Sequence, residues 1–266
     1  MQTVKKPEIL YSCYSRKSSE GEQFIASHNF GYLIAGKSTH FVGDEKFVFE
    51  PGDFRFFRRN QLTRWTKFPP PGGEYQSISI SIDQEILKSI SEEYNLYATN
   101  RNHDLKALLL PSVPLLRNYI DSLRPYMDKS NDLNQGLTHL KVKEAVMVLL
   151  EVCPSLKEVL FDFNAPGKID LEAYMNEHFR FNVDLSRFAY LTGRSLATFK
   201  RDFEKIYNLS PNRWLQHKRL NYAHHLIKER GWKPSDVYLE VGFKDLSHFS
   251  FAFKKAYGVS PSKLTV

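Results

Sequence analysis

The stretch that decides the fold is 184–211, DLSRFAYLTGRSLATFKRDFEKIYNLSP, because a related stretch follows at 236–261, DVYLEVGFKDLSHFSFAFKKAYGVSP. The residues that recur fifty positions later are Phe199, Phe203, Lys205, Tyr207, Ser210 and Pro211. In each copy a short amphipathic segment ends at a glycine, Gly193 or Gly242, ahead of the recurring block. Since a helix, a glycine turn and a second helix make a helix-turn-helix, the sequence predicts two such units.

Each piece of the first unit has a local reason. Asp184 can cap a helix that Gly193 ends through a positive φ, and Ser195 can cap the next helix. Helical spacing predicts an inward face on this second helix made of Leu196, Phe199, Phe203 and Ile206 or Tyr207. Its outward face is basic, which suits the major groove of DNA: Ala197, Thr198, Lys200, Arg201 and Lys205.

A long helix should connect the two units. Asn208 can take a left-handed conformation at the end of the preceding helix, as Gly258 does in the second copy. Ser210 and Pro211 then provide a cap and a first helical residue, and Gly231 provides a stop. At ~1.5 Å per residue this helix is roughly 28 Å long. Recognition helices at its two ends could meet successive major grooves, ~34 Å apart.

Two segments here resemble the AraC/XylS family of bacterial transcription regulators. They are Ser210-Pro211-x-x-Trp214-Leu215-x-x-x-Arg219-Leu220 and Val241-Gly242-Phe243-x-x-x-Ser247-His248-Phe249, which lie within about one hundred similar residues. The resemblance implies a seven-helix, double helix-turn-helix domain that binds double-stranded DNA and acts with RNA polymerase. It also implies an N-terminal domain that binds an effector or mediates dimerisation. Pro234, Tyr238 and Phe251 depart from the family pattern.

The expected DNA contacts combine this resemblance with the outward faces of the two second helices. In the first unit they are Arg194, Ser195, Ala197, Thr198, Lys200, Arg201 and Lys205, followed by Arg219 on the long helix. In the second unit they are Lys244, Leu246, Ser247, His248, Ser250, Phe251, Lys254 and Lys255.

Charge supports a nucleic-acid partner for the C-terminal part of the chain. The 266 residues carry a formal net charge of +7. Residues 170–266 contribute +6 of it, whereas residues 1–169 contribute only +1. A basic excess gathered in one region is typical of DNA-binding proteins. A merely solvated basic surface is the alternative, and the repeat disfavours it.

The N-terminal part has a β pattern. Gln76, Ile78, Ile80 and Ile82 alternate with serines, as expected of a strand with one buried face. Pro51-Gly52-Asp53 reads as a turn and resembles one in the cupin-like domains of this family. Short strands joined by such turns predict a small barrel or sandwich. Five strand residues could line an effector pocket, or they could belong to the hydrophobic core: Tyr32, Phe47, Arg55, Phe57 and Trp65.

Metal and catalytic signals are weak. His28 and His40 are the only histidines of the β region and do not form a ligand-spaced cluster. Cys13 and Cys153 are the only cysteines, which excludes a disulfide framework and fits the cytoplasm. We therefore expect no metal, no cofactor and no catalysis, with a cupin-type enzyme carrying a DNA-binding tail as the alternative. No apolar run long enough to span a membrane occurs.

Helical periodicity begins after Asp83, which can cap a first helix. Pro114 can open a second helix carrying Leu115 and Leu116, and a third runs from about Leu133 to Val152 with Leu140 on its apolar face. These helices could pack on the β-domain or form a homodimer interface, and a regulatory protein could replace the small-molecule effector. The predicted α+β organisation is therefore a regulatory domain at 1–163, a linker at 164–169 and a DNA-binding domain at 170–266.

Overall fold

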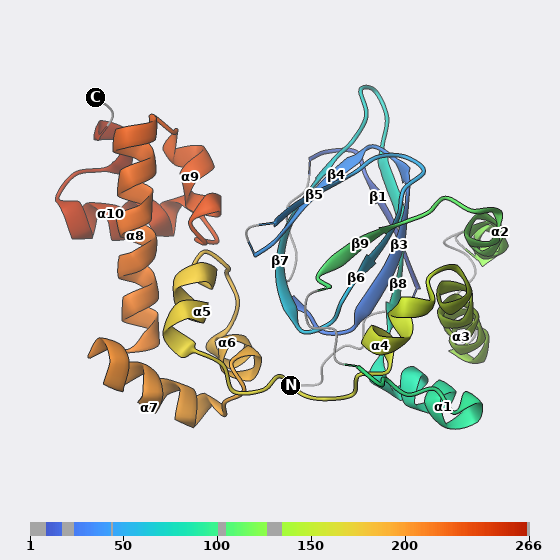
Figure 1. Cartoon of the computed structure of the whole chain (residues 1–266). Helices are drawn as coiled ribbons and strands as arrows, with labels where there is room; N and C mark the ends of the chain where they lie inside the picture. The colour runs from blue at the N-terminus through green and yellow to red at the C-terminus, as the bar shows by residue number, and fades with distance from the viewer. Residues whose placement is uncertain (1–8, 18–23, 44, 101–104, 127–134, 265–266) are drawn as a thin grey trace. The chain divides into compact units, whose positions relative to one another are not determined.

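The computed structural model describes residues 9–17, 24–43, 45–100, 105–126 and 135–264. The chain forms two compact units, Met1–Asn164 and Ala165–Val266. The first unit is α+β and the second is helical (Figure 1). The strands of the first unit are β1 (Ile9–Tyr14), β2 (Phe24–Ile25), β3 (His28–Ala35), β4 (Lys37–Val42), β5 (Glu45–Phe49), β6 (Phe54–Phe57), β7 (Gln61–Phe68), β8 (Tyr75–Ile82) and β9 (Ala107–Leu110).

The described strands form two antiparallel sheets. One sheet has the order β1-β8-β3-β6-β9 and the other has the order β2-β7-β4-β5. They are cupin-like but do not close into a barrel. Gly52, with φ of +97°, makes the turn between β5 and β6, and the Asp53 carboxylate accepts from the backbone N–H of Glu50 at 2.7 Å. The predicted turn at 51–53 is confirmed.

Helices cover one face of the five-stranded sheet (Figure 1). They are α1 (Gln84–Tyr94), α2 (Pro114–Leu123), α3 (Gln135–Val152) and α4 (Lys157–Leu160), with the short 3-10 helices η1 (Arg124–Tyr126) and η2 (Pro154–Leu156). Ile78, Ile80 and Ile82 of β8 are buried in the cluster beneath these helices. Alternating isoleucine and serine therefore marks the two faces of this sheet, as the sequence predicts.

The layer between the two sheets has a second, smaller apolar cluster. Leu33, Phe57 and Tyr75 come from the five-stranded sheet, and Val42 and Phe49 come from the four-stranded sheet. All five side chains are at most 3% exposed. The two sheets therefore face each other across a packed layer, and side chains of the opposite parity in β3, β6 and β8 point to the helices instead.

The connector helices follow their predicted signals where the structure describes them, with the exception of Leu140. Asp83 caps α1 by accepting from the Ile86 N–H at 2.9 Å, and α2 begins at Pro114. The predicted start of the third helix at Leu133 lies outside the described residues. Leu140 is 62% exposed, because the buried face of α3 runs through Val142, Ala145, Val146 and Leu149 instead. Strand β9 was not predicted, since a four-residue apolar run does not reveal its pairing with β6.

The second unit contains α5 (Leu171–His178), α6 (Leu185–Leu191), α7 (Leu196–Tyr207), α8 (Pro211–Arg230), α9 (Pro234–Glu240), α10 (Leu246–Tyr257) and the 3-10 helix η3 (Pro261–Lys263). Asp170 caps α5 by accepting from the Ala173 N–H at 2.9 Å, whereas Asp184 holds the N-cap position of α6 without a side-chain cap bond. Asn208 is left-handed with φ of +51°, as predicted. Helix α8 ends at Gly231, also as predicted.

The two turn glycines are required on two grounds. Gly193 has φ of +66° and Gly242 has φ of +92°, a region that other residues rarely adopt. A Cβ on Gly193 would lie 2.4 Å from the carbonyl of Gly167, and one on Gly242 would lie 2.4 Å from the carbonyl oxygen of Arg180. Each glycine therefore gives its unit a tight turn and a close backbone approach.

Candidate nucleic-acid interface

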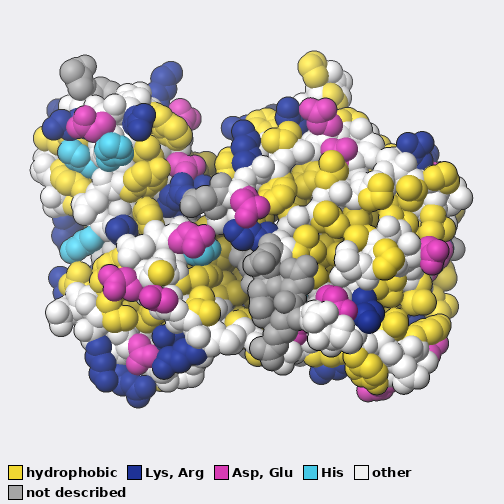
Figure 2. Space-filling model, viewed as in Figure 1, with side chains coloured by type: hydrophobic (Ala, Val, Ile, Leu, Met, Phe, Trp, Pro, Cys, Tyr) yellow, Lys and Arg dark blue, Asp and Glu magenta, His cyan; other side chains and the backbone are white. Residues whose placement is uncertain are grey.

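Helix α7 separates an apolar face from a basic one. Phe199 and Phe203 are fully buried, while Lys200, Arg201 and Lys205 are exposed. In Figure 2, Lys and Arg side chains gather over α7, at the lower left. Of the two alternatives at the end of this face, Tyr207 packs inward, with its ring centroid 4.7 Å from that of Phe203 and 4.8 Å from that of Trp214. Leu196 and Ile206 are 40% and 42% exposed, so the inward position predicted for Leu196 is wrong. They lie at the margins of the buried face, where helical periodicity alone does not decide burial.

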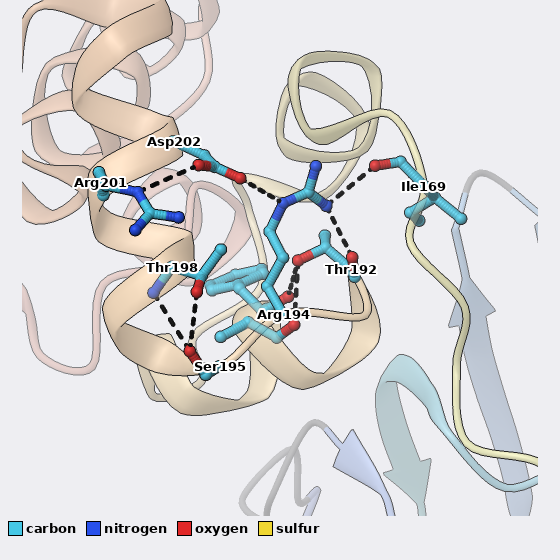
Figure 3. Close-up of polar contacts among 9 residues, drawn as sticks. Ile169, Thr192, Arg194, Ser195, Thr198, Arg201 and Asp202 are labelled. Atoms are coloured by element: carbon cyan, nitrogen blue, oxygen red, sulfur yellow. Dashed lines mark hydrogen bonds and ion pairs between the residues drawn. The ribbon is translucent and has the colours of Figure 1, made fainter.

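Ser195 fixes the start of α7. Its hydroxyl oxygen accepts from the Thr198 N–H at 3.2 Å, and the hydroxyl donates to Thr198 Oγ1 at 3.0 Å (Figure 3). This satisfies one of the N–H groups that a helix leaves unpaired at its first turn. Both hydroxyls thus serve the helix cap, and Ala197 lies exposed between them in the sequence.

Arg194 lies inside a polar network of the unit, not on its basic face. Its Nε donates to the Asp202 carboxylate at 3.2 Å, and its Nη1 donates to the carbonyls of Thr192 at 2.6 Å and Ile169 at 2.9 Å (Figure 3). Only 8% of its side chain is exposed. The hydrogen bond from Arg194 is the main cause that lowers the pKa of Asp202. The guanidinium of Arg194 therefore fixes the turn ahead of α7, and its expected DNA contact stays a prediction.

Arg201 is the more accessible arginine at this site. Its Nε lies 3.7 Å from Asp202, yet 65% of its side chain is exposed. The network thus orients Arg201 without burying it. Lys200, the preceding residue, is also exposed. Two guanine-compatible donors therefore stand side by side on the outward face of α7.

Helix α10 buries a phenylalanine face as α7 does, but the composition of its exposed face differs from that of α7. Phe249, Ala252 and Phe253 are buried, whereas Phe251 is 70% exposed. Asp245 caps the helix by accepting from the His248 N–H at 2.6 Å. The exposed residues on or beside this helix are Lys244, Leu246, Ser247, His248, Lys254 and Lys255, and Ser250 is half-buried. The outward face of α10 therefore combines lysines with two apolar side chains.

Arg219, the DNA contact expected on α8, also forms hydrogen bonds within its own unit. Its Nε and Nη2 donate to the carbonyl oxygens of Phe179 and Phe181, both at 2.8 Å. Burial lowers its pKa to about 10. Since the guanidinium already ties α8 to the segment between α5 and α6, it acts in the fold of the unit.

A groove of about 540 Å³ lies between the starts of α6, α8 and α10. Its lining includes the amides of Asn182, Asn212 and Gln216, the imidazole of His248, the cations of Arg219 and Lys244, and the carboxylates of Asp184 and Asp245. The sequence did not point to the two asparagines or the glutamine, because three separate segments bring them together. The groove therefore brings amides, cations and carboxylates together on the surface between the two helix-turn-helix units.

The expected effector pocket is divided between two faces of a sheet. Tyr32 lies on the helix side, where its ring centroid is 4.6 Å from that of Phe54. Arg55 pairs with Gly31 and Phe57 pairs with Asn29, so their side chains point to the layer between the sheets. Phe47 packs against that layer, and Trp65 pairs with His40 in register. Tyr32 therefore lies on the opposite face of its sheet from Arg55 and Phe57.

His28 and His40 are buried, and burial is the main cause that lowers the pKa of each. For His28 the pKa is about 3. Within the described ranges, no group of three or more His, Cys, Asp or Glu residues could hold a metal ion. No helix in the same ranges is both long and apolar enough to cross a membrane.

Known proteins match both units. Residues 188–265 match the family model of a helix-turn-helix domain, and residues 28–157 match that of the ExsA N-terminal regulatory domain. The virulence regulon transcriptional activator VirF of Yersinia enterocolitica is 30% identical over 243 residues, covering 87% of this chain and 86% of VirF. The chain belongs to the AraC family of transcription regulators.

Two further comparisons extend over most of the chain. The transcriptional regulator ExsA of Pseudomonas aeruginosa is 25% identical over 237 residues, covering 87% of this chain and 83% of ExsA. A crystal structure of apo ToxT from Vibrio cholerae covers 96% of each chain with a TM-score of 0.47 and 13% identity. The protein is thus a DNA-binding transcription regulator with an N-terminal regulatory domain.

Proposed function

We propose that α7 and α10 enter two successive major grooves on one face of a DNA duplex. The support is the repeated arrangement, in which each helix buries its phenylalanine face and exposes the opposite face. Both repeats adjoin α8, whose 20 residues span about 30 Å. This length is close to one turn of B-DNA, ~34 Å. Where the phosphate backbone passes the groove between the units, Asn212, Gln216 and Lys244 can donate to it, while the carboxylates of Asp184 and Asp245 also line the groove.

The first unit reads bases through Lys200 or Arg201. Both side chains are exposed on α7 and can donate to the O6 and N7 acceptors of guanine. Replacing the residue that contacts the guanine with Ala should cost about 1–3 kcal/mol of binding free energy on the specific site and relax the specificity at one base pair. Binding of Lys200→Ala and Arg201→Ala to specific and random DNA tests this. Equal losses on both DNAs for both variants would refute it.

The second unit discriminates between DNA sequences less strongly than the first. Phe251 is 70% exposed on α10 and can touch a thymine methyl, but it cannot donate a hydrogen bond. The lysines beside it hold phosphates, which position the helix without specifying sequence. A binding-site selection with Phe251→Arg tests this division. We expect the half-site facing α10 to be the less constrained in wild type and to gain a guanine in the variant; equal information in both wild-type half-sites contradicts it.

The regulatory unit controls DNA binding, either by binding an effector or by forming a dimer. The support for a protein contact is that Leu115 and Leu140 are 41% and 62% exposed on the connector helices. A regulatory protein partner is the alternative to a small molecule. The protein acts in the cytoplasm with RNA polymerase and does not catalyse a reaction. Mass measurement in solution of Leu140→Lys against wild type tests the dimer: a dimeric wild type and a monomeric variant support it, and a monomeric wild type contradicts it.

A further inference from the structure

The segment immediately ahead of the first helix-turn-helix also contacts the second one. It comprises residues 179–182, between α5 and α6, and is called the crossing segment below. The Arg180 Nη1 donates to the carboxylate of Glu240, the last residue of α9, at 3.2 Å. Both side chains of this ion pair are largely buried, with 19% and 27% exposed. The crossing segment is therefore tied to the first helix of the second helix-turn-helix.

The crossing segment also packs against the turn between α9 and α10. Gly242 lies in this turn, and a Cβ there would lie 2.4 Å from the carbonyl oxygen of Arg180. At that distance only the hydrogen of a glycine fits, so the two backbones are in direct contact. Since α10 begins at Leu246, shortly after this turn, the crossing segment supports the part of the chain that leads into the second recognition helix.

Helix α8 holds the crossing segment as well. Arg219 donates to the carbonyl oxygens of Phe179 and Phe181, both at 2.8 Å. The ring of Phe179 packs edge-on against that of Tyr222, with 5.7 Å between the centroids. The guanidinium carbon of Arg180 lies 5.8 Å from the centroid of the same Tyr222 ring. The segment is thus held by α8, by α9 and by the turn ahead of α10.

These contacts restrict the movement of one helix-turn-helix relative to the other. Two such motifs joined by one long helix can change their distance and rotation when that helix bends, and long helices are rarely straight. A second connection opposes this movement, because bending α8 would strain the contacts of the crossing segment with Glu240 and Gly242. The spacing between half-sites on DNA follows the geometry of the protein that binds them.

We propose that the crossing segment fixes the distance and rotation between α7 and α10, and thereby sets the spacing between half-sites that the protein accepts. Arg180 and Glu240 are then positioning residues, which act on specificity without contacting a base. This inference rests on the proposed function, in which α7 and α10 enter successive major grooves. One base pair inserted between the half-sites moves the second half-site by about 3.4 Å and rotates it by about 34–36°. A protein of fixed geometry cannot follow both changes.

The experiment measures the affinity of the full-length protein for DNA duplexes that differ only in spacing. They are the site selected by the wild type, and the same site with one base pair inserted or deleted between its half-sites. The spacing penalty is the ratio of the Kd on an altered duplex to the Kd on the selected duplex, at one salt concentration. For the wild type we expect a penalty of about tenfold or more, because contacts in one half-site are lost.

Two substitutions remove the ion pair, Arg180→Met and Glu240→Gln, and the second keeps the shape of the side chain. Each should lower the spacing penalty by about threefold to fivefold, the size of effect expected of one partly exposed ion pair. Arg180→Glu should lower it at least as far, because it places two carboxylates together. Combining Arg180→Glu with Glu240→Arg should restore the wild-type penalty. Since the DNA is the same in every comparison, its own deformation energy cancels.

Glu177→Gln and Arg230→Met are the matched controls. Both residues are exposed, and they lie in the last turns of α5 and α8. They make the same changes of charge as Glu240→Gln and Arg180→Met and should keep the wild-type penalty. A merely structural role of the Arg180–Glu240 pair would lower Tm and weaken binding to all duplexes equally, which leaves the ratio unchanged. The ratio therefore separates positioning from folding.

The inference is overturned if the wild type binds the altered duplexes as well as the selected one, or if Arg180→Met and Glu240→Gln keep the wild-type penalty. It is also overturned if the controls lower the penalty equally or if the exchanged pair does not restore it. Failure of the proposed function gives a different result. A footprint of the wild type with a single protected segment rejects the two-groove arrangement itself, whereas two protected segments retain it and leave the spacing penalties to decide the inference.

Discussion

Arg219→Met tests the reassignment of Arg219 from DNA contact to fold. The substitution removes two charge-assisted hydrogen bonds of 2.8 Å to the carbonyls of Phe179 and Phe181 and keeps most of the apolar stem. A hydrogen bond to a charged group contributes about 1.5–3 kcal/mol. Because the site is only partly buried, water can reach the released carbonyls, so we take the lower end for each bond. The expected loss in the free energy of unfolding is about 3 kcal/mol.

The assay combines urea unfolding of the full-length chain with DNA binding across a salt series. The matched control is Lys205→Met, an exposed residue of α7. We expect Arg219→Met to destabilise the protein while the salt slope of DNA binding stays unchanged. Lys205→Met should stay within about 0.5 kcal/mol of wild-type stability, because surface substitutions usually do. It should lower the slope by about one. Wild-type stability together with a slope reduced by about one for Arg219→Met would refute the reassignment.

Three further predictions concern the stability role of Arg194, the salt dependence of DNA binding and the titration of Lys67. Arg194→Met should lower the free energy of unfolding by about 2–4 kcal/mol in urea titrations, through loss of its bonds to two carbonyls, without changing the salt slope. With Arg194 and Arg219 assigned to the fold, the expected phosphate contacts are Lys205, Lys244, Lys254 and Lys255. Log K should therefore fall with log salt with a slope of roughly −3 to −4, and a slope near zero contradicts this. Lys67 has a pKa of about 8 in the fold, below its ordinary 10.5. Between these two pH values the unfolded chain binds more protons than the folded chain, so the free energy of unfolding should rise with pH by about 3 kcal/mol in total. The same rise in Lys67→Met would exclude Lys67 as its source.

The DNA-binding half could be predicted because its signals are local. Ser195, Asn208 and Gly231 act within a few residues of their own positions, and the repeat presents the same signals twice. Arg194 and Arg219 could not be assigned in the same way. Their partners are backbone carbonyls at Ile169, Phe179 and Phe181, and a carbonyl belongs to every residue, so no residue type marks it.

The regulatory half was predicted in outline, and its strand registers were not. Tyr32 was grouped with Arg55, yet Arg55 pairs with Gly31, so one residue of register places Tyr32 on the opposite face of the sheet. Lys67 and His40 were not recognised as neighbours of Arg55, because the sheet that carries them packs on the other sheet only through long-range contacts. Alternation reveals that a strand has two faces but not which other strand each face meets.

The most direct test of the central claim is a hydroxyl-radical and guanine-methylation footprint of the protein on its selected DNA site. Two major-groove segments should be protected on one face of the duplex, with centres one helical turn, about 10 bp, apart. Lys200→Ala or Arg201→Ala should remove protection of a guanine in one segment only, and Phe251→Arg should change the other. A single protected segment, or two segments on opposite faces of the duplex, would contradict the account.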